Sequence, residues 1–173
     1  MIGPQPTGMD ADNFLGRERQ HMYGHILLPV DGTGQSERAA HRGIELARAL
    51  KARVTVVTVT TPWATQFSRE LAVVVPDVIV PESEYERKAH AAAATVLARI
   101  GEAAIAADVP CKTMHLRHRD PSLAILGDAS AEGCDLIVMG SQASGGITGA
   151  LLGSETLAVL THGKTPVLVY RQA

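Results

Sequence analysis

Short aliphatic runs alternate along the chain with longer stretches in which apolar residues recur every third or fourth position. The runs are typical of buried strands and the periodic stretches of helices. The pattern predicts strands at His25–Asp31, Arg53–Thr60, Lys112–Arg117, Asp135–Met139 and Pro166–Tyr170. It predicts helices at Ser36–Leu50, from Glu84 to about Ala107, from Pro121 to about Ala131, and from Ser154 to about Thr161.

Polar residues mark where some of these helices begin and end. Ser83 and Glu86 have the spacing of a capping box and predict the start of the long alanine-rich helix. Asp120 directly before Pro121 predicts an N-cap followed by proline at the first helical position. Gly133 is expected to end that helix.

Five strands that alternate with four helices predict an α/β fold. Crossover connections are right-handed, so this order predicts one open parallel sheet with helices on both faces, a Rossmann-like architecture. In such sheets ligands bind beyond the carboxyl ends of the strands. Two loops are expected there, Asp31–Gln35 after the first strand and Gly140–Gly153 after the fourth.

Two stretches lie outside this alternation. Met1–Gly24 contains prolines, glycines and scattered charges with no apolar period, and we expect a flexible tail followed by one folded domain over residues 25–173. Thr61–Pro81 has three prolines and the apolar stretch Leu71–Val75, which predicts a long loop with a short strand. Its role, as a lid or as part of an interface, stays open.

Composition narrows the class of protein. Hydrophobic residues make up 46% of the chain and aromatic residues only 3%, so the core must be aliphatic, as in a parallel α/β sheet. Sixteen basic and eighteen acidic side chains give a net charge of -2, which disfavours nucleic-acid binding. No apolar run is long enough for a membrane span. Cys111 and Cys134 match no metal-ligand spacing and predict reduced thiols in a cytoplasmic protein.

The loop Gly140–Gly153 carries the strongest chemical signal. It contains five glycines between a buried strand and a helix. Glycines let backbone N–H groups approach a phosphate closely, and a helix start offers further donors and a positive dipole end. Ser154, expected at the N-cap, would add a hydroxyl donor. The alternative is that these glycines only end a strand and cap a helix.

Several segments with fixed spacing resemble the universal stress protein family. They are Ile26–Gly32, Arg119–Pro121, Val138–Ser141, Leu151–Ser154 and Thr165–Val169. The resemblance extends from about Tyr23 to Arg171 and implies a five-stranded sheet in the order 3-2-1-4-5. It also implies a homodimer formed through the fifth strand, Pro166–Tyr170, whose aliphatic edge is a template for pairing with another chain.

The nucleotide-binding branch of that family has the loop pattern glycine, two residues, glycine, nine residues, glycine, then serine or threonine. Gly140, Gly153 and Ser154 match this pattern, and Ala143 departs from it at the second glycine. If that position requires positive φ, a Cβ costs on the order of 1 to 2 kcal/mol. The resemblance implies ATP, with magnesium, as the ligand, and Ala143 weakens that inference.

The resemblance also assigns the remainder of the site. Val30 and Asp31 would line the adenosine site, the backbone of Val59 would face adenine, and Met139 would pack beside the ring. Asp31 has an alternative role as a turn or cap residue. The complete predicted site is Val30, Asp31, Val59, Met139, Gly140, Ser141, Ala143, Gly153, Ser154 and Glu155.

Two functions remain in competition at this point. The first is a dimeric stress-response regulator that binds ATP or a related adenine nucleotide, with slow hydrolysis at most. The second is an interaction module of the same fold that acts through its dimer surface on an unknown protein partner. Ala143 and the lack of any lysine or arginine between Ser141 and Ser154 favour the second. No catalytic residue and no metal ligand is predicted, and a true hydrolase would lack a general base beyond Asp31.

Overall fold

The computed structural model describes residues 22–66, 81–141 and 152–171. The strands are β1 (His25–Pro29), β2 (Arg53–Thr60), β3 (Cys111–Arg117), β4 (Leu136–Gly140) and β5 (Val167–Tyr170). The helices are α1 (Gly34–Leu50), α2 (Trp63–Gln66), α4 (Glu82–Ala106), α5 (Pro121–Ala131) and α6 (Ser154–His162). The predicted strands and long helices are all present, and none of their ends differs by more than two residues.

The strands form one five-stranded sheet in the order β3-β2-β1-β4-β5, and every neighbouring pair is parallel. This confirms the predicted fold class and strand order. Strand β1 lies in the middle, with β2 on one side and β4 on the other. The chain therefore reverses its direction of winding at β1, which places the topological switch point between β1 and β4.

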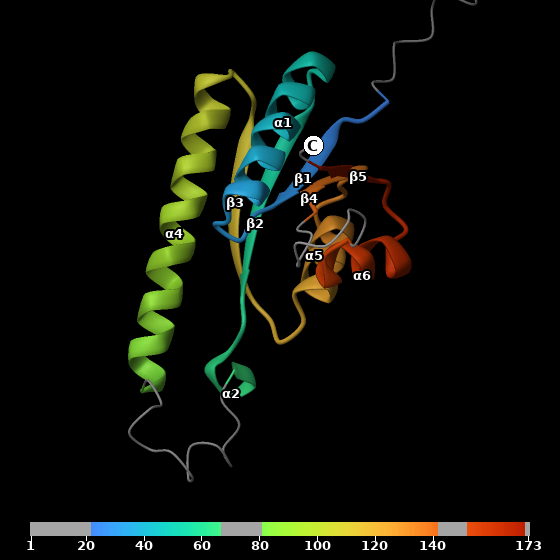
Figure 1. Ribbon diagram of the computed structural model, residues 1–173. Coiled ribbons are helices and arrows are strands. Elements are labelled where there is room, and N and C mark those ends of the chain that lie inside the picture. The colour runs from blue at the N-terminus through green and yellow to red at the C-terminus, as the bar shows by residue number, and fades with distance from the viewer. Residues whose placement is uncertain (1–21, 67–80, 142–151, 172–173) are drawn as a thin grey trace, which may run out of the picture.

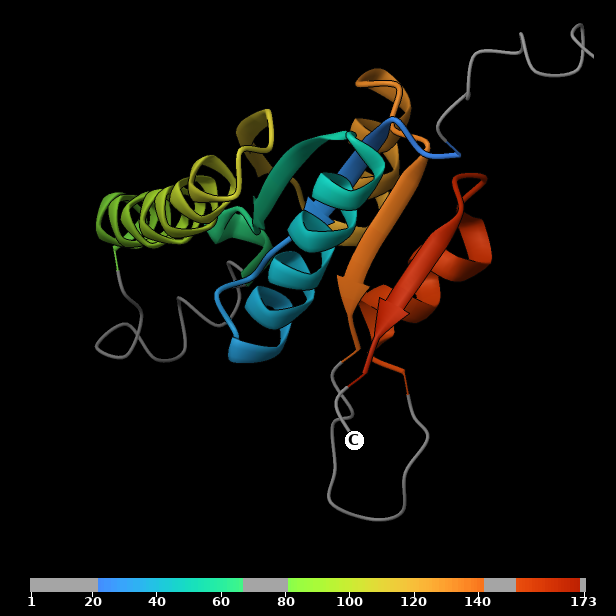
Figure 2. The same ribbon diagram turned by 90° about the horizontal axis from the view of Figure 1, so that it is seen from above.

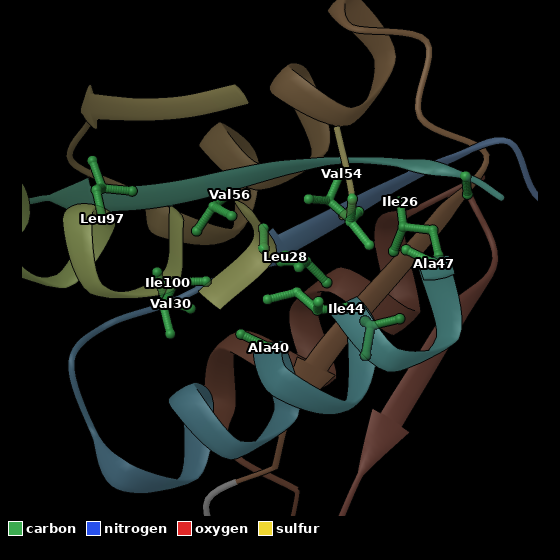
Figure 3. Packing of buried hydrophobic residues seen from close by; sticks show 14 of the residues in the cluster. Ile26, Leu28, Val30, Ala40, Ile44, Ala47, Val54, Val56, Leu97 and Ile100 are labelled. Atoms are coloured by element: carbon green, nitrogen blue, oxygen red, sulfur yellow. The ribbon is translucent and has the colours of Figure 1, made fainter. Parts of the chain in front are cut away.

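Helices cover both faces of this sheet (Figures 1 and 2). Side chains alternate between the faces along each strand. On one face, Ile26 and Leu28 of β1 pack with buried residues of α1 and α4, and Figure 3 shows them opposite Ile44 and Ala47 of α1. On the other face, Leu27 packs in a second cluster with residues of β4, α5 and α6.

The start of α5 is confirmed as predicted. The Asp120 carboxylate accepts a hydrogen bond from the Leu123 N–H at 3.1 Å, and Pro121 occupies the first turn. Gly133, just beyond the helix, has a φ of 66°, which glycine adopts without strain.

The predicted capping box of the long helix is wrong. The N-cap of α4 is Pro81, and no side chain caps the helix. Instead of reaching back to the helix start, Glu86 forms an ion pair with Arg117 at 2.5 Å and accepts a hydrogen bond from the Trp63 N–H at 3.3 Å. Glu86 therefore joins α4 to β3 and α2.

Two predicted irregular segments are described only in part. In Thr61–Pro81 the short helix α2 follows β2, and the Tyr85 hydroxyl donates to the Thr61 carbonyl at 2.9 Å. The expected strand at 71–75 lies outside the described residues. Of the predicted tail, residues 1–21 also lie outside them. Tyr23 packs against the core and the Gly24 N–H donates to Asp135 at 2.8 Å, so the folded part already includes these residues.

Candidate functional site

A cavity of about 300 Å³ lies beyond the carboxyl ends of β1, β2 and β4. This is the switch point at which open α/β sheets bind ligands. Most of the residues expected at the site line this cavity: Val30, Asp31, Val59, Met139, Gly140, Gly153, Ser154 and Glu155. Segments far apart in the sequence therefore meet at one place.

The cavity is also lined by six residues that were not predicted from the sequence. They are Pro29, Ser36, Val57, Pro121, Ile125 and Thr156. Pro121 and Ile125 lie on α5, whose start at Asp120 is visible in the sequence as a helix signal. Because α5 follows the carboxyl end of β3, its first residues must lie at the same edge of the sheet as the cavity, and the sequence order shows this.

The cavity has an apolar part and a polar part. Val57, Val59, Ile125 and Met139 belong to the hydrophobic cluster beneath α5 and α6 and supply apolar walls. Carboxylates and hydroxyls form the other part, from Asp31, Ser36, Ser154, Glu155 and Thr156. Apolar walls beside a few polar groups are typical of sites for small organic ligands.

Asp31 is held by the loop that follows β1. Its Oδ1 accepts hydrogen bonds from the Thr33 hydroxyl at 2.7 Å, the Thr33 N–H at 3.0 Å and the Ser36 hydroxyl at 2.5 Å. Burial works to raise the pKa of the Asp31 carboxyl, but the hydrogen bonds from Ser36 and Thr33 outweigh it and hold the pKa below its ordinary value. Asp31 thus has the turn role foreseen as the alternative, while its Oδ2 takes no hydrogen bond within the described residues.

Gly140 and Ser141 connect β4 to the start of α1. A Cβ on Gly140 would lie 3.0 Å from the Gln35 carbonyl oxygen, so any side chain here would press on the start of α1. The Gln35 side-chain amide donates to the Ser141 carbonyl, and the Ser141 N–H donates to the Tyr170 carbonyl at 3.1 Å. Ser141 is 3% exposed and is not among the residues that line the cavity. Ala143 lies outside the described residues.

The start of α6 differs from the prediction in one respect. Gly153, not Ser154, is the N-cap, and Ser154 is the first helical residue. Instead of pointing its one hydroxyl proton toward a ligand, Ser154 donates it to Glu155 Oε2 at 2.7 Å. Thr156 donates from its hydroxyl to the Gly140 carbonyl at 3.2 Å, which fixes α6 to the end of β4.

The described residues contain neither a cluster of metal ligands nor a helix suited to a membrane. Within 22–66, 81–141 and 152–171, no three His, Cys, Asp or Glu side chains are grouped so that they could hold a metal ion. In the same residues, none of the helices has the length and apolar character needed to cross a membrane.

The sequence model of the universal stress protein family matches residues 22–171. The chain belongs to this family. Among universal stress proteins, a relative from Thermus aquaticus, described as lying in the QAH/OAS sulfhydrylase 3' region, is 32% identical over 151 residues, which cover 87% of this chain and 100% of that protein.

Solved structures of universal stress proteins share the fold. One is described as a complex with cAMP and has a TM-score of 0.61 and 23% identity, covering 87% of this chain and 98% of the other. A second, from Archaeoglobus fulgidus and described as a complex with dAMP, has a TM-score of 0.57 and 18% identity, covering 86% and 98%. At these sequence identities the likeness shows a shared fold and no more than that.

Proposed function

We propose that this protein binds an adenine nucleotide in the cavity at the carboxyl ends of β1, β2 and β4, and that it acts as a regulator in a stress response. The observation that carries the proposal is this cavity, in which the apolar walls of Val59 and Met139 lie beside the polar groups of Asp31 and the start of α6. A flat purine suits the apolar part, and a ribose with its phosphates suits the polar part. The complexes of two family members with cAMP and dAMP support this choice of ligand.

The nucleotide that the family pattern favours is ATP, with magnesium. The cavity contains oxygen atoms of Asp31, Glu155 and Ser154, and oxygen atoms of this kind are the ligands that magnesium prefers. Magnesium commonly binds through one or two carboxylates together with the phosphates of a substrate. We therefore propose that the ion arrives with the nucleotide. Hydrolysis is expected to be slow at most, because the hydrogen bonds from Ser36 and Thr33 hold the pKa of Asp31 low and make it a weak general base.

Calorimetric titration with adenosine, AMP and ATP, the last with magnesium, tests nucleotide binding directly, and phosphate release measured in the same samples tests hydrolysis. We expect saturable binding of the adenine compounds and phosphate release close to background. GTP and CTP serve as controls for recognition of the base. If none of the adenine compounds binds, the competing function, an interaction module that acts on a protein partner, takes its place.

We further propose a homodimer formed through β5. This strand lies at the edge of the sheet, where it pairs with β4 (Figure 2), and Leu168 is 49% exposed. The Pro166 and Tyr170 carbonyls accept bonds from Ile137 and Ser141. Because pairing groups alternate along a strand, the Val167 N–H faces away from β4. An unpaired row of this kind is a template for a second copy of the chain.

Light scattering at micromolar concentration tests the dimer. We expect the mass of two chains for the unchanged protein and of one chain for Val167→Pro, which removes an outward N–H donor. Circular dichroism serves as the folding control. A monomeric parent would contradict the dimer, and a Val167→Pro variant that stays dimeric would place the interface elsewhere.

The cellular location that we propose is the cytoplasm. Cys111 and Cys134 are free thiols, and thiols stay reduced in that compartment. Burial raises the pKa of the Cys134 thiol to about 12, and the neighbouring carboxylates of Asp128, Glu132 and Asp135 add to this shift. Cys134 is therefore an unreactive core residue.

A further inference from the structure

The cavity at the carboxyl ends of the strands is acidic. Its described lining contains two carboxylates, Asp31 and Glu155, and neither lysine nor arginine. The sequence between Ser141 and Gly153 also carries no charged side chain. A phosphate tail that enters this cavity thus meets like charge, in contrast to phosphate sites that place a cation beside the helix start.

Glu155 lies where the phosphate of a nucleotide would bind in the proposed function. It lies in the first turn of α6, and a carboxylate there is stabilised by the same helix dipole that attracts a phosphate. Its Oε2 also accepts the hydroxyl proton of Ser154 at 2.7 Å. The carboxylate therefore takes up both the hydroxyl donor and part of the dipole that a bound phosphate would use.

We infer that this site selects adenine ligands by charge, with Glu155 as the specificity-determining residue: it takes adenosine and singly charged cyclic AMP in preference to free ATP, and it takes ATP only as the magnesium complex. The inference rests on the proposed function, because it concerns the same cavity. The apolar walls, which include Val59, Ile125 and Met139, would contact the base, and that contact does not depend on charge. The site therefore distinguishes adenine ligands only by the charge of their phosphate groups.

The charge on Asp31 reinforces this selection. Its Oδ1 holds three hydrogen bonds from Thr33 and Ser36, which keep the carboxyl ionised at neutral pH. Because these bonds fix the loop after β1, Asp31 cannot be exchanged without disturbing the fold locally. Glu155 is exposed, and within residues 22–66, 81–141 and 152–171 its carboxylate bonds only to its neighbour Ser154, so it is the residue to vary.

The test measures dissociation constants for adenosine, cyclic AMP, AMP and ATP, with EDTA and with magnesium, for the parent protein, Glu155→Gln and Glu102→Gln. Glu102 is exposed on α4, near the end of the helix that leads to the start of β3, so its variant makes the same charge change far from the cavity. In EDTA we expect the parent to bind adenosine and cyclic AMP more tightly than ATP. Magnesium should reverse most of the loss for ATP.

Glu155→Gln should tighten the binding of free ATP by roughly threefold to tenfold, a range that allows for solvent screening of an exposed carboxylate. It should change adenosine binding by less than about twofold, and Glu102→Gln should change neither. Added potassium chloride should strengthen the binding of free ATP to the parent, because salt screens repulsion. This sign is opposite to that of a cationic phosphate site.

The outcomes separate the two proposals. Free ATP that binds more tightly than adenosine in EDTA, or a Glu155→Gln variant that gains equally for adenosine and ATP, overturns selection by charge and leaves nucleotide binding in place. If no adenine compound binds under any condition, the proposed function itself is wrong and the inference falls with it. Circular dichroism and the melting temperature of each variant confirm that the compared proteins are folded.

Discussion

The two ends of the sheet carry cavities of the same size, about 300 Å³ each, but of opposite character. At the amino ends of β1, β2 and β3 the lining includes His25, Arg53, Lys112 and Glu132. There Lys112 pairs with Glu132 at 2.8 Å. At the carboxyl ends the lining carries the carboxylates of Asp31 and Glu155 and no cation among the described residues.

The contrast teaches that charge alone does not identify a ligand site. The amino end has cations that would suit a phosphate, yet the side chains of His25, Thr55, Lys112 and Glu132 are already hydrogen-bonded within this group. His25 Nδ1 lies 3.1 Å from the Glu132 carbonyl oxygen and Nε2 lies 2.8 Å from the Thr55 hydroxyl. The carboxyl end leaves Asp31 Oδ2 without a hydrogen bond in the described residues. This contrast supports the proposed ligand site at the carboxyl end and a stabilising role for the amino end.

The largest effect is expected for Gly153→Val at the carboxyl end. The N-cap φ of -58° and ψ of 153° suit a residue with a side chain, so the variant should fold. Its branched side chain would enter the cavity and abolish nucleotide-dependent stabilisation, which is about 2.7 kcal/mol at 100 times the dissociation constant. Thermal shift with and without ATP and magnesium measures this.

Gly127→Val is the matched control for that change. Gly127 is exposed on α5, and an added Cβ meets nothing within 4 Å. It makes the same substitution outside the cavity lining and should keep the full nucleotide-dependent shift. A Gly153→Val protein that responds to nucleotide as the parent does would remove the carboxyl-end cavity as the binding site.

The next largest effect is a loss of stability expected in helix α1, which lies on one face of the sheet. A Cβ added at Gly43 of α1 would overlap the Leu28 Cδ2, so Gly43→Ala should overpack the core. We expect a loss of roughly 1 to 3 kcal/mol in the free energy of unfolding, with nucleotide affinity unchanged. Urea denaturation measures it.

Gly127→Ala serves as the control in the other helix layer. With open space at that position it should stabilise by about 0.5 to 1 kcal/mol, because alanine is the better helix former. Equal effects at both positions would contradict the close approach of α1 to β1.

A smaller, pH-dependent effect is expected at the amino end. Burial lowers the pKa of His25 below 6.5, and the charge of Arg53 lowers it further. The unfolded chain then binds a proton more readily than the folded protein, so stability is complete above about pH 6.5 and is lost as the pH falls through the folded value. The slope is at most about 1.4 kcal/mol per pH unit.

Denaturation at pH 7.5 and at pH 5.5, for the parent and for His25→Gln, measures this contribution. The variant should be less stable at pH 7.5 and should show the smaller loss on acidification. The same pH dependence in both proteins would show that His25 does not carry it.

These two ends also show how much the sequence could predict. The strands, the parallel sheet and the helix start at Asp120 were predictable from aliphatic runs, crossover handedness and local capping. The order of the strands followed from the resemblance to the family. The expected capping box at Ser83 and Glu86 failed because Glu86 pairs with Arg117, a residue distant in the sequence. Spacing cannot show that competition.

At the carboxyl end, the positions of the site residues were more predictable from the sequence than their roles. Parallel strands bring Asp31 and Gly140 to one edge, so both could be expected near the cavity. Their tasks depend on contacts that only the packed structure shows. Gly140 packs closely against the backbone of Gln35, and the Ser154 hydroxyl donates its proton to Glu155.

The smallest effect is expected for Lys112→Met at the amino end. The Lys112 side chain is 55% exposed and that of Glu132 24%, and exposed ion pairs contribute little in water. We expect the melting temperature to fall by no more than about 3 °C, with a smaller difference in high salt. Methionine keeps the apolar stem of the side chain, so lost packing adds little. Nucleotide affinity should stay within about twofold of the parent, because the cation lies at the end of the sheet opposite the proposed site. A clear loss of ATP affinity in this variant, measured by calorimetry beside Glu155→Gln, would mean that the basic amino end contributes to binding and that the division between the two ends is wrong.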